Sequence, residues 1–335
     1  MKIAEFLRRG IIRVAGGVIV NYFKIGGRRH TLYFGEIPAK YFLLCERHGF
    51  GDELRRIGQK WMYLFFSTLT PSYLRRLSPE RLLNNIVKKM WANLGLIDDF
   101  HVEREGDTLC IEVKREGTTE LIGKNSFQVG FHEGVLNAFY NKETEVVNVR
   151  QTKNRCIYKF RLLPRSFKIE GKSKDEYRRL NSLPRISGVS IQDMLKNKVF
   201  YLKGQRLYFR GKIIYPVENT VIHLFSNKGL MLDKVSCISY DFFQKILKRD
   251  ASENEKLRLL KNLMQVMGWG VFNIIKSNDM LRVNIENPPY GLQKEKDNWD
   301  FLIKMILGYL MAVNKDYKIE EVKEGYKFLG IVFST

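Results

Sequence analysis

Hydrophobic and polar residues alternate with a period of two along residues 200–209, which predicts a β-hairpin with one buried face. The turn is expected at Gly204-Gln205. A similar layout occupies residues 21–44, where GGRRH takes the place of the short turn and LYFGE that of LYFRG. Short amphipathic helices are predicted before the two hairpins, over residues 3–14 and 191–196. In the hairpin at 200–209, one face holds Tyr201, Lys203, Arg206, Tyr208 and Arg210, and the other Phe200, Leu202, Leu207 and Phe209.

Two longer amphipathic helices are predicted downstream, over residues 78–95 and 252–268. Each begins with a serine that can cap its first turn and ends with a glycine, the residue that most often follows a helix. The second helix also has the capping-box pair Ser252 and Glu255.

The order of elements then repeats. Each helix is followed by a strand pair, a second apolar helix and a closing strand pair, at residues 100–113, 127–140 and 145–163 and again at 271–285, 299–313 and 318–333. This repetition predicts an α+β protein made of two tandem copies of a unit with an antiparallel sheet and helices. The predicted boundaries are 1–163 for the first copy, 164–190 for a basic linker and 191–335 for the second copy. Few residues are identical between the copies, so chance similarity is the alternative to duplication.

The composition narrows the class of protein. With 335 residues, 44% hydrophobic and 13% aromatic, the chain can bury enough surface to fold, which excludes wholesale disorder. No apolar run approaches the roughly 18 residues of a membrane-spanning helix, and no signal peptide is expected. The four cysteines are far apart and form no CxxC pair, which favours reduced thiols in a cytoplasmic protein.

The charge is strongly basic and unevenly distributed. The chain has 57 Lys and Arg against 36 Asp and Glu, a net charge of +21. Residues 164–215 alone carry +9, whereas residues 216–335 carry only +2. A local excess of this size attracts polyanions such as nucleic acid. A solvated basic surface without a partner is the alternative.

Three stretches of the second copy carry a family resemblance: RLYFRGKIIYPVENTVIHLF, MGWGVFNIIKSNDMLRVNIENPPYG and WDFLIKMILGYLMAVNKDYKIEEVKEGYKFLGIVF. They resemble the 4-vinyl reductase-type, or hydrocarbon-binding, domain of bacteria and archaea. That family is similar in fold to subunits of vesicle-tethering complexes and to nitric-oxide-sensing domains. The first copy resembles the same family less closely. The resemblance implies small apolar ligands, regulatory roles and dimerisation through helices.

The helix predicted over residues 299–313 is apolar nearly all round, so it must be buried on more than one side. Contact between the two copies explains this, as does a homodimer formed through the same helix. A cavity for an apolar ligand, lined by Trp269, Met305 and Tyr309, is the other explanation.

The basic middle segment also has two interpretations. Residues 164–188 have the prolines, serines and charges of a solvated linker. The hairpin that follows, however, interleaves tyrosines with cations, as single-stranded nucleic-acid binders do. Its candidate residues are Tyr201, Lys203, Arg206, Tyr208 and Arg210, together with paired arginines of the first copy such as Arg28 and Arg29.

The sequence contains no complete catalytic or cofactor-binding motif among those considered. GTTELIGKN lacks the spacing and the final Ser or Thr of a phosphate-binding loop. Cys45 and His48 have no second ligand pair nearby, and His132-Glu133 lacks the HExxH spacing, so a surface pair is expected there. We therefore predict no metal, no cofactor and no enzymatic activity. The function expected is a non-catalytic binding or regulatory scaffold, with nucleic-acid binding as the alternative.

Overall fold

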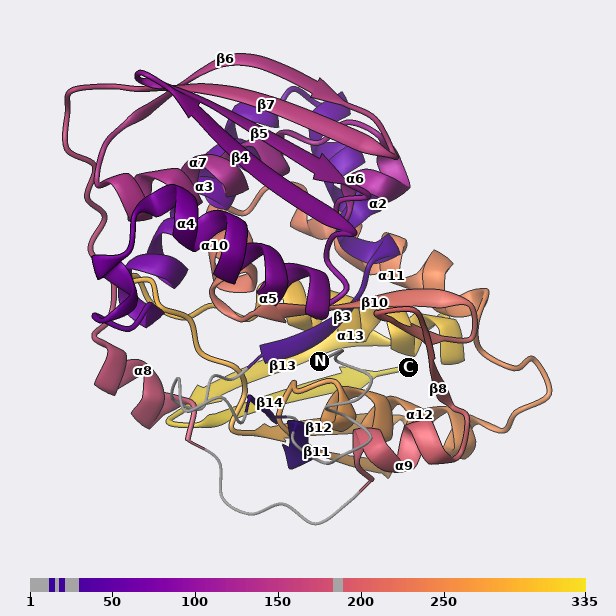
Figure 1. Cartoon of the computed structure of the whole chain (residues 1–335). Helices are drawn as coiled ribbons and strands as arrows, with labels where there is room; N and C mark the ends of the chain where they lie inside the picture. The colour runs from indigo at the N-terminus through magenta and orange to yellow at the C-terminus, as the bar shows by residue number, and fades with distance from the viewer. Residues whose placement is uncertain (1–11, 16–17, 22–29, 183–188) are drawn as a thin grey trace.

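The computed structural model describes residues 12–15, 18–21, 30–182 and 189–335. These residues form an α+β fold, in which the described strands make three four-stranded antiparallel sheets and a short pair of strands. Figure 1 shows one sheet at the upper end of the molecule, one at the lower end and the third between them, with helices filling the space between the sheets. Among the described residues, no helix has the length and hydropathy needed to cross a membrane.

The first unit extends from α2 to β7. Its elements are α2 (Glu36–Arg47), α3 (Gly51–Leu69), η1 (Leu74–Arg76), α4 (Pro79–Leu82), η2 (Leu83–Val87), α5 (Lys88–Asn93), β4 (Asp99–Glu105), β5 (Thr108–Lys114), α6 (Thr119–Ile122), α7 (Ser126–Tyr140), β6 (Thr144–Gln151) and β7 (Arg155–Leu162). The strands form the first sheet in the order β4-β5-β7-β6.

The second unit extends from α10 to β14. Its elements are α10 (Thr220–Lys228), α11 (Leu232–Gln244), α12 (Glu253–Val266), β11 (Val271–Ser277), β12 (Met280–Glu286), α13 (Asp300–Val313), β13 (Lys318–Gly325) and β14 (Phe328–Ser334). Its strands form the second sheet in the order β11-β12-β14-β13. The sequence therefore predicted correctly the strand pairs and the helices that separate them.

The two sheets agree in register as well as in order. Glu105 pairs with Thr108 across a two-residue turn, as Ser277 pairs with Met280. The edge strands β6 and β13 each contain a bulge at the same place, directly after the residue that pairs with Phe160 in one sheet and with Phe333 in the other. Duplication of the unit stays a prediction, which this shared arrangement supports.

The two serine-capped helical segments, 78–95 and 252–268, differ in length by one residue. Ser78 and Ser252 cap them, each accepting a hydrogen bond from the backbone three residues on, as predicted. The first helix has one residue more before its glycine than the second. That residue is absorbed by the π-helical turn η2, because a π turn holds one residue more than an α turn.

A central sheet joins the two units. It has the order β3-β10-β9-β8, from β3 (His30–Phe34), β8 (Phe200–Lys203), β9 (Arg206–Phe209) and β10 (Lys212–Glu218). The hairpin β8-β9 turns at Gly204-Gln205 and follows α9 (Ile191–Lys196), as the alternation predicted. Because β3 pairs with β10, a strand that precedes the first unit is hydrogen-bonded to one that precedes the second.

Two predictions about the N-terminal region change. Residues 12–15 form strand β1 (Ile12–Ala15), which pairs with β2 (Val18–Asn21), so the predicted helix over 3–14 is wrong at that end. The remainder of that helix and residues 26–29 of the GGRRH turn lie outside the described residues, while His30 begins β3. The strand expected after the turn ends at Phe34, and helix α2 begins two residues later.

The segment predicted as a solvated linker is partly docked on the protein. Lys172 Nζ lies 2.7 Å from Asp297 Oδ2 and 3.1 Å from the Gly291 carbonyl oxygen. Helix α8 (Lys174–Leu180) buries Tyr177, whose hydroxyl donates to the Glu218 carboxylate at 2.8 Å. The Lys172 charge and the Tyr177 hydroxyl of this segment are therefore satisfied within the chain.

Candidate functional site

The first candidate site is the apolar pocket expected at Trp269, Met305 and Tyr309. All three side chains are buried. The indole of Trp269 meets the Tyr33 ring edge-on at 4.7 Å, and its Nε1 donates to the Leu32 carbonyl oxygen at 3.2 Å. Trp269 therefore fills the junction between helix α12, strand β11 and the edge of the central sheet.

The other two pocket candidates also make close contacts. The Tyr309 ring lies 4.6 Å from that of Phe243, and its hydroxyl donates to the Lys256 carbonyl oxygen at 2.7 Å. Burial raises the pKa of the Tyr309 hydroxyl, so it remains a donor at any physiological pH. The carbonyl oxygen of Met305 accepts a hydrogen bond from Ser239. These positions are held by neighbours within the chain.

Helix α13, the helix predicted to be apolar all round, is buried inside the chain. A Cβ at Gly308 would lie 2.2 Å from the Ser236 carbonyl oxygen, which shows how closely α13 crosses α11. At its N-terminal end, Phe301 lies 5.4 Å from the ring of Tyr41 in the first unit. The helix thus uses most of its apolar surface within the chain, while Leu307 and Met311, one turn apart, are half-buried. The homodimer expected through this helix stays a prediction.

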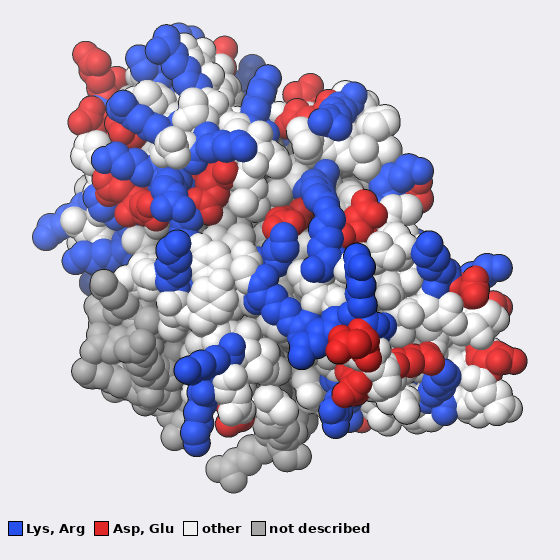
Figure 2. Space-filling view, turned by 90° about the vertical axis from the view of Figure 1, so that its right-hand side faces the viewer, with Lys and Arg blue, Asp and Glu red and all other residues white. Residues whose placement is uncertain are grey.

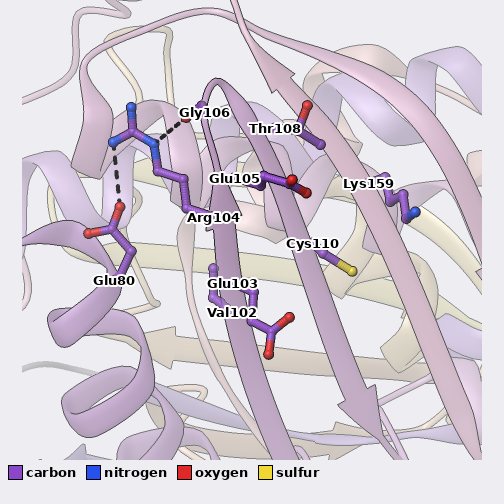
Figure 3. A pocket seen from close by; sticks show the side chains of 9 residues that line it. All are labelled: Glu80, Val102, Glu103, Arg104, Glu105, Gly106, Thr108, Cys110 and Lys159. Carbon is purple, nitrogen blue, oxygen red and sulfur yellow. Dashed lines mark hydrogen bonds and ion pairs between the residues drawn. The ribbon is translucent and has the colours of Figure 1, made fainter.

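A hollow of about 720 Å³ lies beside the β4-β5 hairpin of the first sheet (Figure 3). Arg104 reaches across its edge, with Nη1 3.5 Å from Glu80 and Nε 2.7 Å from the Gly106 carbonyl oxygen. The remaining lining residues are Val102, Glu103, Glu105, Thr108, Cys110 and Lys159. The hollow is open and its charges have both signs. Among the described residues, no group of three or more Asp, Glu, His or Cys is placed to hold a metal.

The second candidate site is the outer face of the β8-β9 hairpin. Tyr201 and Tyr208 face one another across the strands with ring centroids 5.4 Å apart and an interplanar angle of 13°. Tyr201 is 42% exposed, and Lys203, two residues further along β8, is also exposed. The alternation therefore predicted correctly that these residues share a solvent-facing side. An aromatic platform beside a cation is the arrangement on which single-stranded bases stack.

Arg206 corrects one part of that prediction. It was expected on the exposed face, yet its side chain is only 6% exposed. Its guanidinium pairs with Glu120 and lies 3.1 Å from Asp98, both in the first unit. The Tyr215 hydroxyl donates to the same Glu120 at 2.8 Å. Alternation placed Arg206 on the correct side of the strand, but residues distant in sequence cover that end of the hairpin.

Two further arginines, Arg210 of the predicted surface and Arg55 of an arginine pair in the first copy, also have partners within the chain. Arg210 is exposed, but its guanidinium donates to the Ile246 carbonyl oxygen and lies 5.2 Å from the centroid of the Phe209 ring. Arg55 forms a bidentate pair with the buried Glu133, at 2.6 and 2.7 Å. Arg28 and Arg29 lie outside the described residues. Figure 2 shows Lys and Arg gathered in the middle of one face, with Asp and Glu directly beside them.

A buried polar network in the first unit was missed from the sequence. His132 and Glu133 were predicted as a surface pair, yet both are 1% exposed. His132 Nε2 lies 2.5 Å from Glu116, and the Tyr158 hydroxyl donates to the same carboxylate. At the position of Tyr158, the second sheet has Ile331. The network therefore belongs to the first unit and is not required by the fold.

The spacing of two glycines was the signal that could have revealed this burial. Gly130 and Gly134 are one helical turn apart on α7, and their Cβ positions would lie 1.7 and 2.1 Å from carbonyl oxygens of α3. Such spacing permits close approach of helix backbones. It places α7 against α3 and buries the residues between the glycines.

The cysteines offer no assembled metal site within the described residues. Cys45 and Cys156 are buried, and burial raises the pKa of their thiols to about 11 and about 12. His48, the potential partner of Cys45, instead contacts the Leu44 carbonyl oxygen at 2.9 Å.

Comparison with known proteins finds no protein family and no curated protein that matches this chain.

Proposed function

We propose that the protein is a non-catalytic binding or regulatory scaffold, built from two units of the hydrocarbon-binding type. The observation that supports this proposal is the common strand order, register and bulge of the first and second sheets. Two of the three stretches on which the family resemblance rests form the second of these sheets and helix α13. Fold alone does not decide activity, so the proposal depends on where a ligand could bind.

An apolar ligand would have to compete with contacts already made inside the second unit. Trp269, Met305 and Tyr309 are buried and packed against neighbouring residues. Native mass spectrometry of the purified chain, followed by thermal unfolding with a medium-chain fatty acid, tests this form of the scaffold. Met305→Ala enlarges the space beside α13, so an apolar ligand should stabilise this variant more than the wild type. If neither protein carries an adduct or is stabilised, an apolar ligand in the second unit is contradicted.

The second candidate function is binding of single-stranded nucleic acid. It is favoured by the exposed Tyr201–Tyr208 pair with Lys203 beside it. Stacking of a base on an aromatic side chain contributes about 1–3 kcal/mol, and phosphate contacts by cations make such binding salt-dependent. The carboxylates around Arg206 limit the surface to the hairpin end that holds the tyrosines.

Fluorescence anisotropy with a labelled single-stranded oligonucleotide tests this candidate. Tyr201→Ala should weaken binding by about 5- to 150-fold, the equivalent of one lost base stack. Lys203→Glu should weaken binding and also reduce its dependence on salt. Lys159→Glu, an equal charge change on the distant first sheet, serves as the matched control. Absence of binding at about 50 mM salt, where phosphate contacts are strong, contradicts this candidate.

A further inference from the structure

The outer faces of the first and second sheets have different chemistry at equivalent positions. In both sheets alternate residues point into the core, such as Leu109 and Ile111 on β5 and Leu281 and Val283 on β12. The residues between them form the outer face. Because the two sheets share their register, every outer position of one has a counterpart in the other.

Charged residues of the first sheet are replaced by apolar residues in the second. The pairs are Asp99 and Val271, Glu103 and Ile275, Arg155 and Phe328, and Lys159 and Val332. In addition, Glu112 corresponds to Asn284 and Thr108 to Met280. The change is in the other direction at Cys110, which corresponds to Arg282, and a charge is kept where Lys114 corresponds to Glu286. Since the first sheet has the same fold with charges at these places, the fold does not require apolar residues there.

The charges of the first sheet suit a face that remains in water. Arg155 lies 2.7 Å from Glu112, and Arg161 lies 3.1 Å from Glu145, in both cases across neighbouring strands. The second sheet instead exposes large apolar side chains, with Ile275 at 49% and Met280 at 43%. Clustered exposed apolar side chains of this kind mark a contact surface.

The net charge of this face favours contact between copies of the chain. On β11, β12 and β14 its charged residues are Arg282 and Glu286. Strand β13 adds Lys318, Glu321 and Lys323, together with Glu320 at the bulge, whose carboxylate accepts from Ser334. The face is therefore close to neutral and carries both signs, whereas the whole chain has a net charge of +21. The net positive charge makes two such chains repel one another. The repulsion is weakest where the facing surfaces are neutral and can pair opposite charges.

The size of the face is also suitable. Four strands of seven or eight residues cover about 20 Å by 25 Å, an outline of about 500 Å². A stable interface buries about 800 Å² on each partner, and homodimer interfaces are the most apolar class. An interface of ordinary size would therefore use this whole face and the turn beside it, where Tyr326 is 73% exposed. Figure 1 shows the second sheet at the lower end of the molecule, away from the first sheet.

We propose that the outer face of the second sheet, formed by β11, β12, β14 and β13, is a two-fold interface between two copies of this chain. A two-fold contact uses the same patch on both subunits, so one near-neutral face suffices. The first sheet then remains in water at each end of the dimer. This proposal does not depend on the ligand of the scaffold.

Sedimentation velocity and light scattering of the full chain test the interface. The wild type should have twice the 39.4 kDa mass of one chain. The double variant Ile275→Glu, Val332→Lys installs the residues that the first sheet carries at these positions, so the fold should tolerate it. Its dimer dissociation constant should rise at least about 100-fold. In the dimer, the new charged side chains would be removed from water without an oppositely charged partner.

Val147→Glu is the matched control, because it changes an exposed valine of the first sheet by the same kind of substitution. This variant should remain dimeric, and circular dichroism should show both variants folded. A monomeric wild type at all accessible concentrations overturns the proposal. So does a double variant that is folded and still dimeric, or a different protein bound at this face of a monomeric wild type.

Discussion

Trp269 and Leu32 form a two-way connection, although 237 residues separate them in sequence. The Trp269 indole donates to the Leu32 carbonyl oxygen, while the Leu32 amide donates to the Met267 carbonyl oxygen at 2.7 Å. Both main-chain polar groups of Leu32, on the edge of β3 opposite β10, are thereby satisfied by residues at the end of helix α12. Through Leu32, the first half of the chain thus contacts the second half on this edge of β3, in addition to the pairing of β3 with β10.

Trp269→Ala should lower the free energy of unfolding by about 3–5 kcal/mol, the usual cost of removing a large buried aromatic side chain. Trp269→Phe should cost less, about 1–3 kcal/mol, because a ring remains against Tyr33 while the Leu32 carbonyl loses its donor. Urea denaturation measures both values. An unchanged stability of Trp269→Ala contradicts the buried position of this residue.

Arg206→Ala should destabilise the protein by about 3 kcal/mol, because it leaves the buried carboxylate of Glu120 without its main partner. Lys203→Ala is the control: Lys203 pairs with Arg206 across the hairpin but is exposed, so its loss should change stability by less than about 0.5 kcal/mol. Reversal of Arg206 to glutamate, which alternation alone presents as a harmless surface change, should prevent correct docking of the two units. Equal stability of the two alanine variants would count against the ion cluster.

Glu218 predicts a pH dependence of stability. Burial raises the pKa of its carboxyl, although Tyr177, Thr220 and Trp61 donate hydrogen bonds to it. A raised folded-state pKa means that the native protein holds the proton more tightly than the unfolded chain. Stability should therefore decrease as the pH rises from the ordinary glutamate value to the raised one, by up to about 1.4 kcal/mol per pH unit.

Glu218→Gln should remove that part of the pH dependence. The donors to one carboxylate oxygen are the hydroxyls of Tyr177 and Thr220, which can turn to accept from an amide group. The other oxygen, which accepts from Trp61 and the Thr220 amide, is kept as the amide oxygen. Thermal unfolding of both proteins from acidic to neutral pH gives the comparison, and parallel curves would show that Glu218 does not titrate in this range.

Gly130→Ala should destabilise the first unit by about 3 kcal/mol or more, because its Cβ would lie 1.7 Å from the Arg55 carbonyl oxygen and force α3 and α7 apart. Gly204→Ala is the control, since a Cβ there meets nothing within 4 Å and costs only the strain of a left-handed backbone, about 1 kcal/mol. Chemical denaturation compares the two. A similar cost at both sites would contradict the close helix crossing.

Local patterns in the sequence predicted many, but not all, of the elements of this protein. Period-two alternation located the β8-β9 hairpin, and serine caps located the helices that begin after Ser78 and Ser252. These signals depend on interactions between residues near in sequence. The repeated order of elements then predicted an α+β fold with antiparallel sheets.

Only the tertiary structure decided which side chains are covered and by what. Alternation assigns Arg206 to a face, but the carboxylates that bury it come from residues 98 and 120 of the other unit. The apolar character of residues 299–313 requires burial, yet only the packing of α13 on α11 shows that the chain itself provides it. Likewise, Glu103 and Ile275 can be recognised as equivalent positions only when the strand pairing of both sheets is known. Burial depends on contacts with residues that are distant in sequence, and the local pattern of one segment does not show which distant residues will cover it.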